Sequence, residues 1–238
     1  MQIIVLAAGK GSRLPKKYRR VPKCLVKVNS KSIIDHNISF IRKFSNRIII
    51  SGYKYKILEN HLKDQNFKHI KNQNYSSTNM VHSLSLAKKF VKDDVVIIYG
   101  DIIFNPNIYK LLSEKKNLLP VNKTWFKNWK ERMGEKKIYE DAEYLKILNN
   151  KIIEIGTKIN KNKIPKYQYM GIMKFKKNSF HDIISFYKTI HNKKIDMTTF
   201  LNLCINKKII NLKAKIYKSY WYEIDTISDH MYAEKKIK

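Results

Sequence analysis

Two glycines and two cations follow the short apolar segment QIIVLA at the start of the chain, as Gly9, Lys10, Gly11 and Arg13. The glycines leave backbone N–H groups free to turn toward an anion, and the two cations add positive charge. The spacing does not match the dinucleotide motif GxGxxG, whose third glycine would fall at Leu14, and the GK[ST] ending of the P-loop is absent. The segment therefore predicts a phosphate-binding loop of another kind.

Alternating strands and helices are expected to position this loop. Four short apolar runs predict strands, and the amphipathic stretches between them predict helices. Runs without polar interruption are typical of parallel strands buried on both faces. The alternation predicts an α/β fold with a Rossmann-like, doubly wound mixed sheet. The strands are expected at residues 2–7, 47–51, 67–70 and 95–99, and the helices at 32–44, 55–63 and 78–90.

The alternation breaks after residue 121. We expect a single domain over residues 1–238 with an excursion at about 122–175, which contains a polar stretch with two tryptophans at 122–141. Two short strands are expected on either side of Asn149 and Asn150. Helices are expected at residues 179–190, 198–205 and 227–236, and a strand at 215–219.

The charge balance is strongly basic, with 49 Lys and Arg against 19 Asp and Glu and a formal net charge of +30. Such an excess favours polyphosphate binding without sequence preference, so a nucleic-acid-binding protein is one hypothesis. Only six of the 49 cations are arginine, whose forked guanidinium suits phosphate recognition better than lysine does. The even spread of lysine favours a solvated surface, and we predict no specific nucleic-acid partner.

Other sequence features exclude several classes of protein. The two cysteines, Cys24 and Cys204, fit neither a disulfide framework nor a zinc site, and we interpret both as packing residues. The histidines show no spacing typical of a ligand or catalytic set. No apolar run approaches the roughly 18 residues of a membrane span, and the first eight residues lack the features of a secretory signal. We therefore predict a cytoplasmic protein without a membrane partner.

The segments LAAGKGSRL and PKCLVKV resemble the opening of small-molecule nucleotidyltransferases of the MobA-like and sugar-phosphate type. Members carry LAAGxGxRL, a variable stretch, and PK followed by a short apolar strand. The resemblance implies the nucleotide-diphospho-sugar transferase fold and phosphate-contacting, catalytic roles for Lys10, Arg13 and Lys23. The similarity is closest to the cytidylyltransferase branch that uses choline phosphate, 2-aminoethylphosphonate or L-glutamine phosphate.

The resemblance also implies a set of nucleotide contacts. The glycine loop would hold the phosphates, a GY step after the second strand would line the base, and Gly100 would let the backbone approach the ligand. The segment NYSSTNMVHSL resembles a loop and helix start beside the nucleotide in this branch. Capping of the helix remains the alternative role for Asn79 and Ser83. The expected nucleotide-binding residues are Leu6, Ala7, Ala8, Gly9, Gly11, Gly52, Tyr53, Asn79, Ser83 and Gly100.

Two aspartates match the positions that bind metal in this family. Asp101 ends the strand VVIIY, and Asp225 lies in WYEIDT, which resembles the W-x-E-I-D-T step. Magnesium is commonly held by one or two carboxylates together with phosphate oxygens and water, so the resemblance implies a Mg²⁺ cofactor. Glu223 is a competing ligand on the same face of its strand. Asp229 is expected in the first turn of the last helix.

The excursion is expected to bind the acceptor. It combines aromatic rings, cations and carboxylates, a mixture suited to an anion and an ammonium group. Packing of the tryptophans against the sheet remains the alternative. The expected acceptor-binding residues are Trp125, Trp129, Arg132, Asp141, Glu143, Tyr169 and Asp196.

The resemblance implies a CTP-dependent cytidylyltransferase. It would transfer CMP to the phosphate or phosphonate of a small amine-bearing metabolite, release pyrophosphate and serve surface-polysaccharide decoration, such as capsule biosynthesis. The partners would be CTP, a small phosphorylated acceptor and a second copy in a homodimer. A sugar-1-phosphate nucleotidyltransferase is the alternative enzyme, and a basic nucleic-acid-binding protein is the alternative from another class. A hexose 1-phosphate acceptor therefore stays open, as does UTP in place of CTP.

Overall fold

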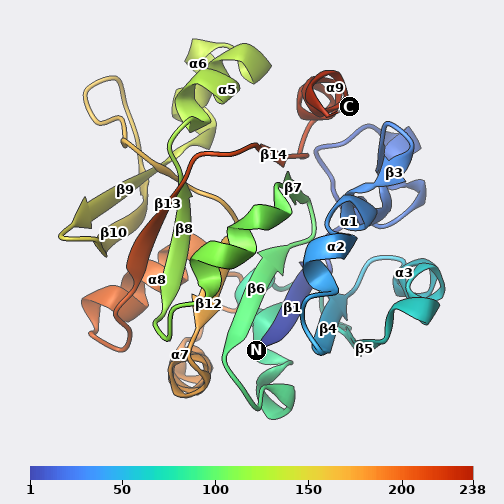
Figure 1. The fold of residues 1–238 in the computed structure, drawn as a ribbon, viewed down its shortest axis with the longest axis horizontal. Coiled ribbons are helices and arrows are strands. Elements are labelled where there is room, and N and C mark those ends of the chain that lie inside the picture. The colour runs from blue at the N-terminus through green and yellow to red at the C-terminus, as the bar shows by residue number, and fades with distance from the viewer. Residues whose placement is uncertain (238) are drawn as a thin grey trace.

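A ten-stranded mixed sheet runs through the computed structural model, which describes residues 1–237 (Figure 1). The strand order is β5-β4-β1-β6-β12-β8-β13-β10-β9, and β11 pairs with β8. The first four strands of this order are parallel, and β12 runs antiparallel to β6. The strands are β1 (Gln2–Ala7), β4 (Asn46–Ser51), β5 (Phe67–Lys71), β6 (Val95–Tyr99), β8 (Leu118–Asn122), β9 (Glu143–Leu148), β10 (Lys151–Lys158), β11 (Gln168–Tyr169), β12 (Ile172–Phe175) and β13 (Lys213–Tyr217).

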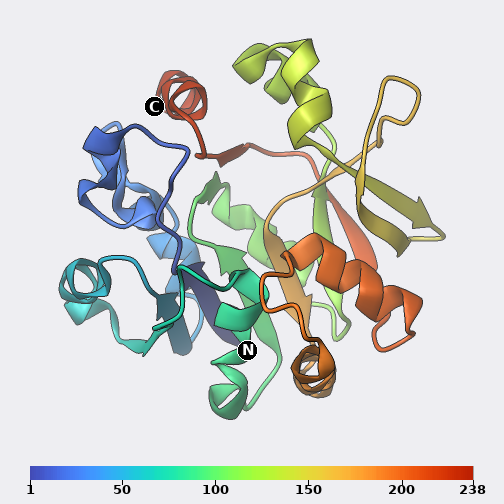
Figure 2. The same ribbon diagram turned by 180° about the vertical axis from the view of Figure 1, so that it is seen from behind.

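Helices cover both faces of the sheet. The pair α1 (Ile33–His36) and α2 (Ile38–Ile41) lies in front of it in Figure 1, and α8 (Met197–Asn206) lies on the opposite face in Figure 2. All residues of β1 and β6 are buried, as expected for strands covered on both sides. The other helices are α3 (Tyr55–His61), α4 (Met80–Ser85), α5 (Trp125–Met133), α6 (Glu135–Asp141), α7 (Lys177–Thr189), α9 (Ile227–Lys236) and the 3₁₀ helices η1 (Lys16–Arg20), η2 (Lys23–Leu25), η3 (Lys63–Gln65), η4 (Lys88–Phe90) and η5 (Pro106–Leu112).

The predicted α/β fold with a mixed sheet is confirmed, and two predicted helices are divided. The helix expected at 32–44 begins as predicted, where Ser32 accepts a hydrogen bond from the Asp35 amide, but Asn37 separates α1 from α2. The helix expected at 78–90 is α4 followed by η4. The apolar strand expected after PK is η2 followed by the two-residue strand β2 (Lys27–Val28), which pairs with β3 (Lys31–Ser32).

The excursion contains more helix than its polar sequence indicated. Residues 125–141 form α5 and α6, while β9 and β10 make the expected hairpin with Asn149 and Asn150 at positive φ. Figure 1 shows α5 and α6 above the carboxyl ends of the central strands. Nearby, β14 (Trp221–Glu223) pairs with β7 (Ile102–Phe104), which follows β6. This pairing brings the segment after Trp221 back to the edge where β1 and β6 end.

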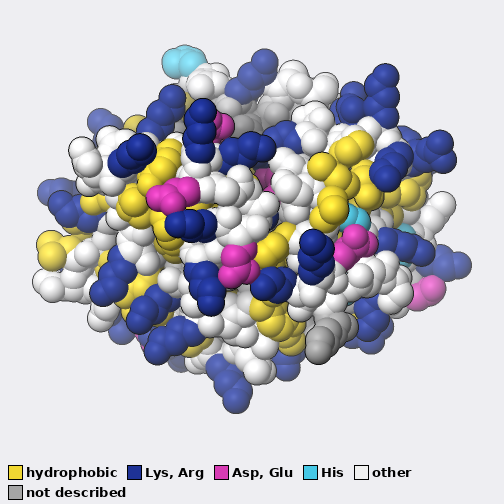
Figure 3. All heavy atoms as spheres, turned by 90° about the horizontal axis from the view of Figure 1, so that it is seen from above, with side chains coloured by type: hydrophobic (Ala, Val, Ile, Leu, Met, Phe, Trp, Pro, Cys, Tyr) yellow, Lys and Arg dark blue, Asp and Glu magenta, His cyan; other side chains and the backbone are white. Residues whose placement is uncertain are grey.

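Positive charge covers the face seen from above in Figure 3. Lys and Arg side chains are spread over the whole of this face, without a single continuous stripe, and acidic side chains are few there. No helix within residues 1–237 combines the length and apolar character needed to cross a membrane.

Candidate active site

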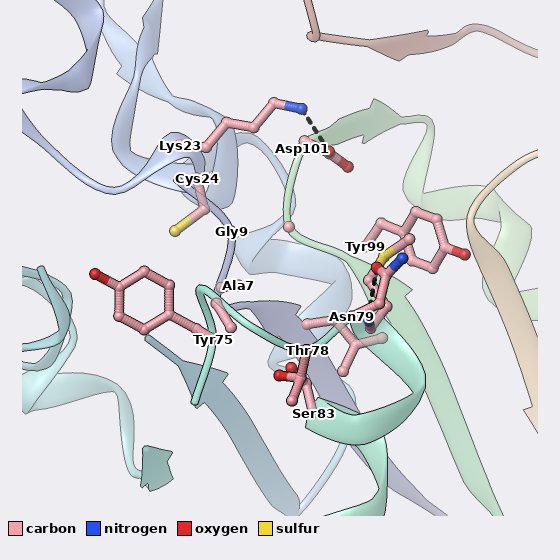
Figure 4. A pocket seen from close by; sticks show the side chains of 14 residues that line it. Ala7, Gly9, Lys23, Cys24, Tyr75, Thr78, Asn79, Ser83, Tyr99 and Asp101 are labelled. Atoms are coloured by element: carbon pink, nitrogen blue, oxygen red, sulfur yellow. Dashed lines mark hydrogen bonds and ion pairs between the residues drawn. The ribbon is translucent and has the colours of Figure 1, made fainter. Parts of the chain in front are cut away.

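A first cavity of about 120 Å³ lies at the carboxyl ends of β1 and β6. One wall is the backbone of the glycine loop, and the opposite wall is the segment before α4 with the start of that helix (Figure 4). The wall residues include Tyr75, Thr78 and Met80. Of the expected nucleotide-binding residues, the cavity is lined by Leu6, Ala7, Ala8, Gly9, Asn79, Ser83 and Gly100.

Three other expected nucleotide contacts support the loop from outside this cavity. Gly11 has φ +65°, and a Cβ there would lie 3.2 Å from the Lys23 side chain. A Cβ on Gly52 would lie 2.6 Å from the Cβ of Tyr75, so the glycine lets that ring approach the cavity. Tyr53 donates its backbone N–H to Ala8 and its hydroxyl to the Arg19 carbonyl, which fastens η1 to the end of β4.

The segment before α4 is organised by Asn72, a residue that the sequence analysis missed. Its side chain is 1% exposed, donates to the hydroxyls of Thr78 and Ser83, and accepts the Asn74 amide. Asn79 accepts the Met80 amide, so the alternative capping role of Asn79 is confirmed while the residue also lines the cavity. A lone asparagine just after a strand gives no sequence signal for this role.

Two aspartates from distant segments converge on Lys23. The Lys23 ammonium lies 2.6 Å from Asp101 Oδ2 and also contacts Asp225 Oδ1, and Arg13 contacts the other oxygen of Asp225. Burial alone would lower the pKa of Lys23, but the two carboxylates outweigh burial and raise that pKa. Burial likewise opposes ionisation of Asp225, yet Lys23 and Arg13 hold the pKa of Asp225 below its ordinary value. Lys23, Arg13 and Asp225 are therefore charged at neutral pH.

The same two carboxylates fit a divalent cation. Oδ1 of Asp101 is buried without a hydrogen-bond partner in the described part of the chain, and both aspartates already share one positive charge. No group of three or more His, Cys, Asp or Glu side chains suited to a metal occurs within residues 1–237. Two carboxylates are enough for Mg²⁺ when substrate phosphates and water complete its coordination.

Glu223 lies beside Asp101 and Asp225, but its surroundings favour the protonated form of its carboxyl group. Burial, followed by the charges of Asp225 and Asp101, raises the pKa of Glu223 well above its ordinary range. Asp229 accepts the amides of Asp225 and Thr226 at the start of α9, which confirms its expected position in the first helical turn. The side chain of Asp229 also lies 3.0 Å from the Arg132 guanidinium.

A second cavity, of about 220 Å³, adjoins the aspartates and extends beneath the excursion. Five carboxylate side chains line it, against one cation, Arg13, among residues 1–237. Five of the expected acceptor-binding residues are present, together with residues that the sequence analysis did not select. The lining includes the expected Trp129, Asp141, Glu143, Tyr169 and Asp196, and the unexpected Tyr99, Gln168, Gly171, Thr198 and Trp221.

Two expected acceptor residues lie elsewhere. Trp125 is 1% exposed and packs edge-on against Trp129 in the core, because the polar stretch forms an amphipathic helix. Arg132 is buried behind the second cavity, with its guanidinium 3.3 Å from Asp141 and 4.5 Å from the centre of the Trp129 ring. The packing alternative therefore describes Trp125, and Arg132 supports the wall rather than lining the cavity.

Asp196 lines the second cavity but has both oxygens occupied. It caps α8 by accepting the Thr199 amide and the Thr199 hydroxyl. Gly171, with φ +71°, lies against Tyr99, since a Cβ there would approach that ring to 2.8 Å. Tyr99 and Met80 line both cavities and therefore lie between them.

The two cysteines are buried. Cys204 is fully buried in the core, whereas Cys24, at 2% exposed, also lines the first cavity. Burial raises the pKa of each thiol to about 12, so neither is a thiolate at neutral pH.

Comparison with known proteins agrees with this fold. Residues 2–238 match the family described as Nucleotidyl transferase, and the chain belongs to that family. Over 96% of its length it is 37% identical to a CTP:phosphoglutamine cytidylyltransferase from Campylobacter jejuni subsp. jejuni serotype O:2, and the match covers 97% of that protein.

Two solved structures share the fold over the whole chain. The inositol-1-phosphate CTP transferase from T. maritima has a TM-score of 0.79, with 96% of that chain covered. The CTP:phosphocholine cytidylyltransferase from Streptococcus pneumoniae has a TM-score of 0.74, with 99% of that chain covered. Each is 20% identical in sequence, so these two likenesses concern the fold alone.

Proposed function

We propose that this protein is a Mg²⁺-dependent cytidylyltransferase that transfers CMP from CTP to the phosphate or phosphonate of a small amine-bearing metabolite. The observation that carries the proposal is the meeting of Lys23, Asp101 and Asp225 between the two cavities. The 37% identity to the Campylobacter jejuni cytidylyltransferase over nearly the whole chain supports CTP as donor and a small phosphorylated acceptor. We expect the protein to act in the cytoplasm and to serve surface-polysaccharide decoration.

In the proposed reaction, an acceptor phosphate oxygen forms a bond to the α-phosphorus of CTP. The bond from that phosphorus to the β-phosphate oxygen breaks, and pyrophosphate leaves. A phosphate oxygen is ionised near neutral pH, so no general base is required. Catalysis is then mainly positioning and charge neutralisation.

This chain's own residues supply most of that positioning. The glycine loop presents backbone N–H groups, with Lys10 and Arg13 beside it, to the leaving phosphates. Lys23 is held at the junction, where charge develops on the reacting phosphoryl group. Asp101 and Asp225 would hold Mg²⁺, which when bound supplies further neutralisation of phosphate charge.

The test measures pyrophosphate release by the purified protein with each of the four NTPs and Mg²⁺. The acceptors are phosphoethanolamine, phosphocholine, 2-aminoethylphosphonate, L-glutamine phosphate and hexose 1-phosphates. We expect turnover with CTP and an amine-bearing acceptor. Turnover confined to a hexose 1-phosphate would instead assign a sugar nucleotidyltransferase. No turnover with any pair, together with salt-sensitive binding of duplex DNA, would overturn the enzymatic proposal.

A further inference from the structure

Two residues that line the second cavity each carry a buried polar atom without a protein partner. Gln168 and Trp221 are only 5% and 4% exposed. The Gln168 Oε1 and the Trp221 Nε1 have no hydrogen-bond partner within residues 1–237. Buried polar groups in folded proteins are normally paired, so these atoms are complementary to a ligand that completes their hydrogen bonds.

A carboxylate lies on the same cavity wall. Glu143 accepts a hydrogen bond from the Thr198 hydroxyl at 2.9 Å through Oε1, and Oε2 makes none within the described residues. Burial, followed by the charges of Asp196 and Asp141, raises the pKa of Glu143. A cationic ligand would relieve this unfavourable environment. Asp196 is occupied as a helix cap, and Asp141 contacts Arg13 and Arg132. Of these three carboxylates, Glu143 is therefore the one with an oxygen free for a ligand.

The indole rings near the second cavity offer a poor cage for a quaternary ammonium. Such a cage needs several open ring faces around the cation. The Trp129 ring is stacked with Trp221 at a centroid distance of 6.1 Å, and the Arg132 guanidinium lies over it at 4.5 Å. Trp125 is buried in the core. Protein groups therefore already engage most of the indole surface near the cavity.

We propose that the second cavity recognises an acceptor whose ammonium group keeps its N–H hydrogens, with Glu143 and Gln168 as the specificity-determining residues. The inference rests on the proposed function and narrows its substrate class. The ammonium donates to Glu143 and to Gln168 Oε1, while the Trp221 N–H donates to an oxygen of the acceptor. A trimethylammonium group has no N–H to donate, so it would leave these buried atoms unpaired.

The test uses phosphoethanolamine and its mono-, di- and trimethylated forms, the last being phosphocholine. Their binding to the protein in the presence of CMP is measured by calorimetry, and pyrophosphate release with CTP and Mg²⁺ gives kcat/KM. We expect affinity and kcat/KM to fall with each methyl group, by roughly 100-fold across the series. Equal or better use of phosphocholine, or binding by none of the four compounds, would overturn the inference.

Two variants test whether Glu143 and Gln168 cause the discrimination between phosphoethanolamine and phosphocholine. Glu143→Gln and Gln168→Leu should each lower kcat/KM for phosphoethanolamine much more than for phosphocholine. Glu59→Gln, at an exposed carboxylate on α3, is the matched control and should keep the full discrimination. Equal losses for both acceptors in either variant would remove that residue from the specificity role. The proposed function would fail in a different way, because then no amine-bearing acceptor would support CTP-dependent turnover.

Discussion

Replacing Lys23 by methionine tests the central ion pair most directly. Methionine has a side chain of similar length but carries no charge, so Lys23→Met removes the ammonium that contacts Asp101 and Asp225. The Lys23 side chain is 11% exposed and that of Asp225 is 9% exposed, so water screens the interaction only weakly. We expect the variant to lose turnover but to be stabilised by Mg²⁺ more strongly than the unaltered protein.

The size of both effects follows from this burial. Removing one partner of a buried ion pair typically costs about 3–5 kcal/mol, so we expect the free energy of unfolding to fall by about 3 kcal/mol without Mg²⁺. A divalent cation can replace the lost positive charge between the carboxylates, so Mg²⁺ should restore much of this stability. Turnover should still fall about 10²–10³-fold, as when a preorganised electrostatic group is removed from an active site.

Urea unfolding with and without Mg²⁺ and pyrophosphate release measure these two effects. Lys27→Met is the matched control, because Lys27 is an exposed lysine on β2, and it should change neither quantity. Turnover of Lys23→Met within about threefold of the unaltered protein would show that the ammonium is not catalytic. A stability loss of the same size with and without Mg²⁺ would show that Asp101 and Asp225 do not form a cation site.

Further predictions concern the neighbouring carboxylates and one glycine. Asp101→Asn and Asp225→Asn should each lower kcat at least about 100-fold with an unchanged circular dichroism spectrum, and retained turnover would remove that residue from the metal site. Gly52→Ala should lower the free energy of unfolding by about 1–3 kcal/mol and weaken CTP binding, because its Cβ would lie 2.6 Å from that of Tyr75. Since the pKa of Glu223 is raised on folding, the folded state keeps a proton that the unfolded chain loses above about pH 4.3, and stability falls as pH rises past that value. Glu223→Gln should therefore stabilise the protein at pH 7 and not at pH 4 in urea unfolding, and an equal change at both pH values would contradict the raised pKa.

Local sequence patterns were sufficient for the parallel strands β1, β4, β5 and β6 and for the position of the glycine loop after β1. The buried strand β6 has the predicted bounds, because an uninterrupted β-branched run is favourable only between two covering layers. The polar appearance of residues 122–141 was misleading, since α5 and α6 bury one face each and expose the rest. The burial of Trp125 depends on that amphipathic face, so composition alone could not decide between the acceptor role and the packing alternative for this ring.

The sequence alone determined the α/β fold class and which residues follow β1 and β6 at the edge of the sheet where the first cavity lies. It could do so because hydrophobic period and glycine position act over a few neighbouring residues. Only the tertiary structure decided which charged groups meet. Lys23 and Asp225 are 202 positions apart, and Glu143 and Thr198 are 55 apart. Their contacts depend on strand order and on the pairing of β14 with β7, which bring distant segments to one edge of the sheet. The unpaired atoms of Gln168 and Trp221 likewise became visible only when burial removed water as a partner.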